Sequence, residues 1–238
     1  MDSMQESEDD LLLSLPVGQV LVGTNWNGAP ITLQTNQSVN MSSTPTGSML
    51  LLYQNISPGN NQGEFHLTSG GGNPHIVPAP PLTNQPGVYN NNWKGNNLAV
   101  SNTSNPGVEV PIRFQALGPG MPGQHPKSLV VGQPLSLQNN ESAQGNTSGA
   151  TQLALVANSG LFSVIGVIGG PMQQGNNAYV IALNSSQNSG PTPGQRIGYY
   201  AQTSNNYYIL PVRWGSSAIW VANLSPQSQS PVQITLRQ

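Results

Sequence analysis

Short apolar segments alternate with polar residues along the whole chain, and glycine or proline interrupts them every few residues. A period of two puts the apolar side chains on one face, which is typical of β-strands. This alternation occurs at residues 31–33, 110–114, 135–137 and 232–236. Continuous apolar segments predict more fully buried strands at residues 50–53, 153–156, 179–183 and 219–221. Since no stretch keeps a helical spacing, the pattern predicts an all-β fold with almost no helix.

The chain also matches itself in a collinear order, which indicates an internal duplication. The matched pairs of segments are residues 30–38 with 134–142, 50–55 with 153–158, 93–102 with 214–223, and the alternating apolar positions of 110–114 with those of 232–236. Each copy has about 100 residues, the usual size of a β-sandwich. The sequence therefore predicts two tandem β-sandwich domains of the jelly-roll or immunoglobulin-like type.

The predicted domain organisation has four parts. We expect an acidic tail over residues 1–17, a first repeat over 18–116, a linker rich in glycine and proline over 117–127, and a second repeat over 128–238. The repeats differ most before their shared tryptophans, Trp93 and Trp214. There the first repeat, residues 68–92, is loop-like, whereas the second has strand candidates at 179–183 and 207–212. Since variable regions on a rigid sandwich carry function more often than shared strands, we expect a site in this divergent region.

Charge narrows the possible partners. Charged residues make up 6% of the chain, against about 25% in an average domain. Five of the eight acidic residues lie in the first ten positions, so the remainder carries six cations against three carboxylates. Without a basic stripe, we expect no nucleic-acid binding. The acidic N-terminus does not resemble a secretory signal, and no apolar stretch is long enough to span a bilayer. We therefore expect no membrane insertion, and a cytoplasmic location or leaderless export.

The inventory of reactive side chains argues against catalysis. The chain has no cysteine and no aspartate beyond Asp10, and its remaining carboxylates, those of Glu64, Glu109 and Glu141, do not recur as a pair in both copies. A glycosidase needs two facing carboxylates, and a serine hydrolase triad needs an acidic member. The three histidines lack metal-ligand spacing, and calcium sites need clustered carboxylates. We expect no enzyme, no cofactor and no metal site.

Neutral amides and hydroxyls are abundant instead, together with paired aromatic residues. Sugars are recognised by such hydrogen-bonding groups and by stacking on aromatic rings, without charge or metal. We therefore predict a lectin-like, metal-independent carbohydrate-binding protein whose ligand-binding residues are Tyr199, Tyr200, Asn205, Asn206, Tyr207, Tyr208, Trp214 and Trp220. Trp93 and Trp214 have a second interpretation as core residues, because tryptophans at equivalent strand positions usually pack inside. The eight Asn-x-Ser/Thr sequences, including those at Asn102 and Asn223, are interpreted as incidental.

The alternative function is a structural subunit of a self-assembling coat, fibre or tube. A chain with few charges on its strand edges is poorly protected against association, so its partner would be another copy of itself. A third hypothesis is a leaderless toxin or adhesin that inserts or docks residues 164–170, although this segment more simply predicts a buried strand with a glycine bulge.

Overall fold

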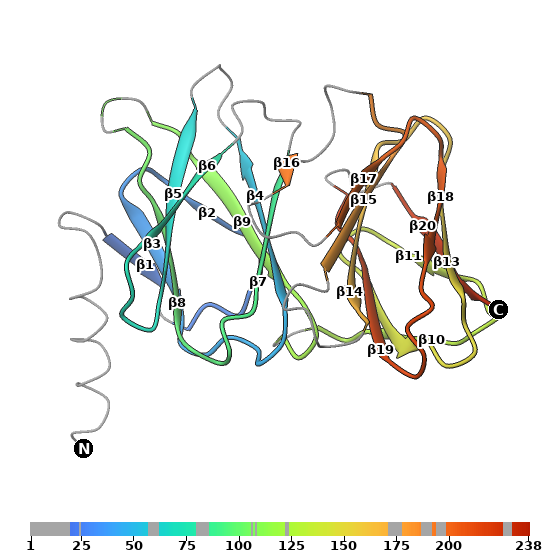
Figure 1. The fold of residues 1–238 in the computed structure, drawn as a ribbon. Helices are drawn as coiled ribbons and strands as arrows, with labels where there is room; N and C mark the ends of the chain where they lie inside the picture. Colours follow the sequence, from blue (N-terminus) through green and yellow to red (C-terminus); the bar gives the residue numbers. More distant parts are fainter. Residues whose placement is uncertain are drawn as a thin grey trace.

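The computed structural model describes residues 20–23, 25–56, 62–79, 86–105, 107, 109–121, 124–170, 178–186, 192–193, 199–225 and 230–238. The predicted acidic tail, residues 1–17, lies outside them. Within this part of the chain there is no helix, and the strands form four sheets. The prediction of an all-β fold is therefore confirmed, and its arrangement is β-sandwich-like (Figure 1).

The first half consists of two sheets that face each other. The strands are β1 (Val20–Gly23), β2 (Ile31–Leu33), β3 (Gln37–Met41), β4 (Met49–Asn55), β5 (Gly63–Ser69), β6 (His75–Ala79), β7 (Gly87–Asn91), β8 (Leu98–Asn102) and β9 (Ile112–Leu117). Sheet A has the order β1-β3-β8-β5-β6, and sheet B has the order β7-β4-β9-β2. Alternate residues of both sheets fill a core around Phe65, Phe114 and Tyr53, whose rings lie 4.7 to 5.0 Å apart.

The second half also consists of two sheets that face each other. Its strands are β10 (Lys127–Leu129), β11 (Leu135–Leu137), β12 (Ser142–Asn146), β13 (Gln152–Ala157), β14 (Ser163–Gly169), β15 (Ala178–Leu183), β16 (Thr192–Pro193), β17 (Tyr199–Gln202), β18 (Tyr207–Pro211), β19 (Ala218–Asn223) and β20 (Val232–Arg237). Sheet C has the order β10-β12-β19-β14-β15-β17, and sheet D has the order β18-β13-β20-β11. Aliphatic residues such as Leu155, Ile165 and Ile234 form the core between them.

Both halves hold one buried asparagine in the same hydrogen-bond pattern, which we call the asparagine clasp. Asn102 Nδ2 donates to the carbonyls of Leu33 (2.9 Å) and Val110 (2.8 Å), while its Oδ1 accepts from the backbone and hydroxyl of Ser104. Asn223 Nδ2 donates to the carbonyls of Leu137 (3.0 Å) and Ser230 (2.7 Å), and its Oδ1 accepts from Ser225. In each half, the clasp joins one sheet to the strand at the edge of the other.

Strand pairing gives the correspondence between the halves residue by residue. Leu33 pairs with Ile112 in the first half, and Leu137 pairs with Val232 in the second. Ile112 therefore corresponds to Val232, two residues away from the predicted match of Ile112 with Ile234. By the same count along the paired strands, Leu50, opposite Leu117, corresponds to Gln152, opposite Arg237. The predicted match of residues 110–114 with 232–236 differs from this count by two residues, and alternating apolar residues match equally well after such a shift.

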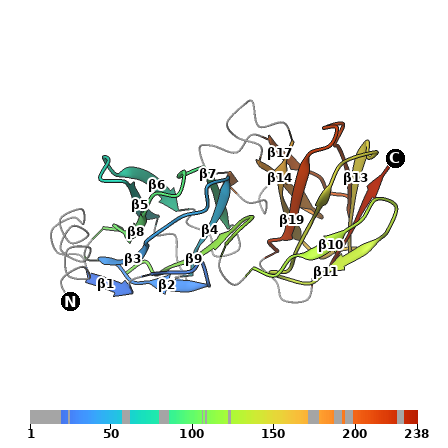
Figure 2. The ribbon, with the colours of Figure 1, turned by 90° about the horizontal axis from the view of Figure 1, so that it is seen from below.

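The two halves pack against each other through a third apolar core. Leu50, Val88 and Leu117 on the outer face of sheet B contact a group on the outer face of sheet C that includes Val180 and Trp220. The molecule is therefore a stack of four sheets in the order A, B, C, D (Figure 2). β16 strengthens this contact because its Thr192 and Pro193 pair in parallel with Gly87 and Val88 of β7.

One local prediction was wrong. The region 68–92, predicted to be loop-like, contains β6 and β7. The sequence pattern does not indicate β7 because this strand contains asparagines, a residue type that is rare in strands. Asn90 lies within β7, and its side chain is fully buried. Gly87 begins β7 where it crosses the ring of Tyr53, and a Cβ atom there would come within 2.0 Å of that ring. Residues 164–169 lie in β14, a buried strand, as the simpler interpretation predicted. The predicted glycine bulge is not seen, because β14 pairs with β15 and β19 without a shift in register.

Candidate functional site

Four aromatic side chains meet where the edges of sheets C and D come together, and we call this group the aromatic edge. Tyr179 of β15 stacks on Trp214, which follows β18, with ring centroids 5.2 Å apart and an interplanar angle of 26°. On its other side Tyr179 lies 6.0 Å from the ring of Tyr199 of β17. The hydroxyl oxygens of Tyr199 and Tyr208 are 2.6 Å apart, so a hydrogen bond joins Tyr208 to the other three rings.

Strand register and one glycine pair place these rings. β15 and β17 run parallel with Tyr179 opposite Tyr199, so both side chains lie on the same face of sheet C. Tyr208 comes from β18, the edge strand of sheet D. Trp214 packs over Gly169 and Gly170, and a Cβ atom on Gly169 would lie 2.9 Å from its indole ring. Larger residues at these positions would push Trp214 away from Tyr179.

The aromatic edge combines an exposed ring with uncharged hydroxyl groups. Tyr199 has 41% of its surface exposed, while Tyr179, Tyr208 and Trp214 are half-buried against the core of the second half. Burial, together with the hydrogen bond to Tyr199, raises the pKa of Tyr208 to about 12. Burial also raises the pKa of Tyr179. Both phenols therefore stay protonated at neutral pH and can donate as well as accept hydrogen bonds.

The other predicted ligand-binding residues lie elsewhere. Tyr200 points to the opposite face of sheet C, against the core between the halves. Asn205 and Asn206 form the turn between β17 and β18, where Asn206 Nδ2 donates to the carbonyl of Ala157 at 3.2 Å. Tyr207 is 55% exposed on the outer face of sheet D. The structure thus gathers three of the eight predicted residues, Tyr199, Tyr208 and Trp214.

Sequence reasoning missed Tyr179, the ring that links the other members. Its segment was predicted to be a buried strand, and β15 is one, yet Tyr179 is the half-buried first position of the apolar run. The neighbouring pair Tyr199-Tyr200 gave no sign of the parallel pairing that brings Tyr199 beside it. That pairing depends on the path of the intervening chain, which local pattern does not specify.

A cleft of about 570 Å³ lies between the two halves of the molecule. Its wall from the first half includes Thr46, Ser48 and Asn92, and its wall from the second includes Gln144, Ser217 and Trp220. Trp220 is only 1% exposed, and its buried indole N–H has no hydrogen-bond partner among the residues that the structure describes. An unpaired buried donor costs about 1 to 3 kcal/mol, so this group is an exception that needs an explanation.

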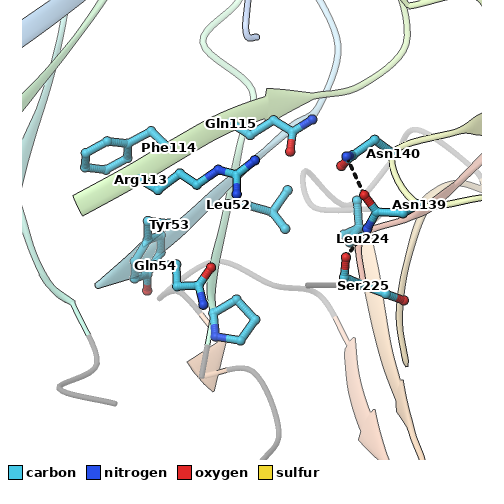
Figure 3. Close-up of a pocket in the computed structure, with 11 residues that line it drawn as sticks. Leu52, Tyr53, Gln54, Arg113, Phe114, Gln115, Asn139, Asn140, Leu224 and Ser225 are labelled. Atoms are coloured by element: carbon cyan, nitrogen blue, oxygen red, sulfur yellow. Dashed lines mark hydrogen bonds between the residues drawn. The ribbon is translucent and has the colours of Figure 1, made fainter. Parts of the chain in front are cut away.

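A smaller cleft of about 180 Å³ opens at another part of the boundary. Figure 3 shows Arg113 and Gln115 of β9 on one side, with Asn139 and Asn140 of the second half opposite them. The two asparagines are already engaged, because Asn140 Nδ2 donates to Asn139 Oδ1 and Asn139 Nδ2 donates to the carbonyl of Ser225. Their hydrogen bonds hold the loop between β11 and β12 against the segment that follows β19.

The described residues contain neither a metal-binding cluster nor a membrane-spanning helix. No group of three or more histidine, cysteine, aspartate or glutamate side chains lies close enough there to hold a metal ion. Within the same residues, no helix has the length and apolar character needed to cross a membrane.

Comparison with known proteins gives no functional assignment. No family model and no curated protein matches the sequence. Among solved structures, the chain is similar to the PBSX exported protein XepA, with a TM-score of 0.22 and 9% identity over 87% of this chain and 84% of that one. It is also similar to the T=1 Penaeus vannamei nodavirus, with a TM-score of 0.18 and 10% identity over 79% of each chain.

Proposed function

We propose that this chain is a non-enzymatic carbohydrate-binding protein whose aromatic edge holds an uncharged sugar without a metal ion. The observation that carries the proposal is the exposed ring of Tyr199 beside paired tyrosine hydroxyls and the stacked rings of Tyr179 and Trp214. A sugar ring has an apolar C–H face for stacking and hydroxyls for hydrogen bonding. No charged side chain belongs to the group, which favours a neutral ligand.

We expect Tyr199→Ala to weaken sugar binding about tenfold, because it removes both the exposed stacking surface and one of the two hydroxyls. Tyr208→Phe keeps the ring and removes only the second hydroxyl, so we expect a smaller loss of about fivefold. A glycan array on the unmodified chain identifies a ligand, and isothermal titration then gives the dissociation constants of both variants.

Tyr207→Ala is the matched control. Tyr207 neighbours Tyr208 in β18 but is exposed on the outer face of sheet D, away from the aromatic edge. Its loss leaves sugar binding unchanged if the proposal is right. Equal losses for Tyr207→Ala and Tyr199→Ala, or an array without any ligand, would overturn the proposed site.

We also infer that the two halves descend from one duplicated unit. The strand orders of the two halves, which match except for the additional edge strand β17 in sheet C, and the two asparagine clasps support this inference. Whether the unit is of the jelly-roll or immunoglobulin-like type stays a prediction. In the first half, Trp93 is only 6% exposed and lies 6.1 Å from the buried ring of Tyr89. The aligned tryptophan is therefore a core residue in that half, and we assign sugar binding to the second half alone.

A second candidate function, a subunit of a self-assembling structure, is favoured by β18. This strand lies at the edge of sheet D, and β13 is its only neighbour in the sheets formed by the described residues. Tyr207 and Ile209 expose 55% and 43% of their surfaces on its outer face. Open strand edges with exposed apolar residues can pair with another copy of the same chain.

If assembly is the function, the purified protein forms large particles as its concentration rises, with or without sugar. Ile209→Lys places a charge beside the open edge and is then expected to shift the elution to the monomer. Size-exclusion chromatography with light scattering across a concentration series measures this. A chain that stays monomeric throughout contradicts assembly and leaves the sugar-binding proposal untouched.

A further inference from the structure

Two exposed arginines lie at one end of sheet D. Arg237 of β20 and Pro211 of β18 are both opposite Gln152 of β13, and the alternation with the core residues of β20 puts Arg237 on the outer face of the sheet. Arg213 follows β18 two residues after Pro211. Neither guanidinium group forms an ion pair or a hydrogen bond with a described residue. This end of sheet D is therefore positively charged.

Apolar side chains continue the same surface along β18. Tyr207 and Ile209 expose 55% and 43% of their surfaces on the outer face of the sheet. They lie opposite Val156 and Ala154 of β13. Since a strand rises about 3.4 Å per residue, Pro211 and Tyr207 are about 14 Å apart along β18. The outer face of sheet D thus has a cationic end and an apolar end.

The acidic tail, residues 1–17, has the complementary pattern. Five of the eight acidic residues of the chain lie in its first ten positions. The last three of them, at residues 8–10, directly precede the segment 11–15, which has four leucines. An extended chain from residue 10 to residue 15 spans at most about 18 Å, close to the separation of the two ends on sheet D. The tail can therefore match both ends when it runs antiparallel to β18.

The leucine segment of the tail cannot reach sheet D of its own molecule. Val20 begins β1 in sheet A, and sheet D is at the opposite end of the stack of sheets (Figure 2). Stacked sheets lie about 10 Å apart, so sheets A and D are about 30 Å apart. Leu15 is five residues before Val20, which allows a distance of at most about 18 Å. Only a second copy can offer its sheet D to this segment.

We propose that the acidic tail of one copy docks on the outer face of sheet D of a second copy. The carboxylates of the tail contact Arg213 and Arg237, and its leucines pack on Tyr207 and Ile209. Extended segments commonly bind along an open strand edge, and β18 is an edge strand of its sheet. The contact is head-to-tail, so it builds an open chain or a closed ring. The inference rests on the second candidate function, self-assembly, and identifies the surfaces that join the copies.

An exchange of charges between the two surfaces tests this contact. Arg213→Glu/Arg237→Glu gives a face that repels the unmodified tail, and Asp9→Lys/Asp10→Lys gives a tail that repels the unmodified face. Each double variant alone should associate at least about tenfold more weakly in sedimentation velocity across a concentration series. An equal mixture of the two should assemble again, because each tail then meets a face of opposite charge. High salt should weaken the assembly of the mixture and of the unmodified chain.

Lys94→Glu is the control for a change in net charge. Lys94 is an exposed cation in the turn between β7 and β8 of the first half, so its replacement should leave association unchanged. Assembly that survives in both double variants overturns the tail contact and leaves self-assembly standing. Two double variants that fail to assemble when mixed also overturn the head-to-tail contact. An unmodified chain that stays monomeric at every concentration overturns both the contact and self-assembly.

Discussion

Replacing Asn223 by alanine is expected to lower the free energy of unfolding by about 3 kcal/mol. The side chain is fully buried and takes part in four hydrogen bonds, two donated to the carbonyls of Leu137 and Ser230 and two accepted from Ser225. Alanine leaves these partners without a replacement in a place that water does not reach. Urea unfolding followed by circular dichroism measures the change.

Asn205→Ala is the control for this prediction. Asn205 is an exposed asparagine of the same half that uses only its backbone in the hydrogen bonds described, one with Thr203 and one with Asn184. Its side chain can be removed at a cost below about 0.5 kcal/mol. If Asn223→Ala also costs less than about 1 kcal/mol, the clasp is not a major source of stability and the geometry of the second half depends on its apolar core alone.

The clasp shows what the sequence concealed. Asn102 and Asn223 fell within the aligned segments, but the Asn-x-Ser pattern was interpreted as incidental because asparagine and serine are common throughout the chain. In the structure the serine two residues later, Ser104 or Ser225, donates to the same asparagine oxygen. The local pattern could have indicated a turn, but one of the two carbonyls that accept from Nδ2 belongs to a strand distant in sequence, that of Leu33 or Leu137. Only the fold brings them near.

The strands were predicted well where apolar residues alternate, because that alternation corresponds directly to the two faces of a sheet. The segment 50–53 is instructive, since its continuous apolar pattern predicted burial beyond one face. The structure explains it, because Leu51 and Tyr53 enter the core of the first half while Leu50 contacts the second half. The sequence indicated that both faces were covered, but it did not indicate by what.

The candidate site was predicted only in part for a similar reason. Tyr208 and Trp214 lie close in sequence, whereas Tyr199 joins them through the parallel pairing of β15 with β17. Trp220 was predicted as a ligand-binding residue in the same group, and the structure instead places it between the halves, on the outer face of sheet C. A period of two does not tell which face of a sheet meets another domain and which one stays open.

Leu50→Asp is expected to separate the two halves, with a loss of stability of at least about 4 kcal/mol. Leu50 is fully buried in the core between sheets B and C, beside Gly166 and Leu224. A carboxylate at this position is buried among the apolar residues of the core between the halves, so it becomes solvated only if the sheets move apart. Each half keeps its own core of buried residues, so we expect two unfolding transitions in place of one.

Gln152→Asp is the matched control, because residue 152 is the counterpart of residue 50 on the outer face of sheet D. It is half-buried and lies opposite the exposed Arg237, so a carboxylate there is solvated and faces a positive charge. We expect a change in the free energy of unfolding below about 0.5 kcal/mol and a single unfolding transition.

Differential scanning calorimetry measures the number of transitions, and small-angle X-ray scattering measures the radius of gyration. A Leu50→Asp variant that unfolds in one step, with an unchanged radius of gyration, would show that the apolar contact between the halves does not hold them together. In that case the pairing of β16 with β7 would be the described contact that fixes their arrangement.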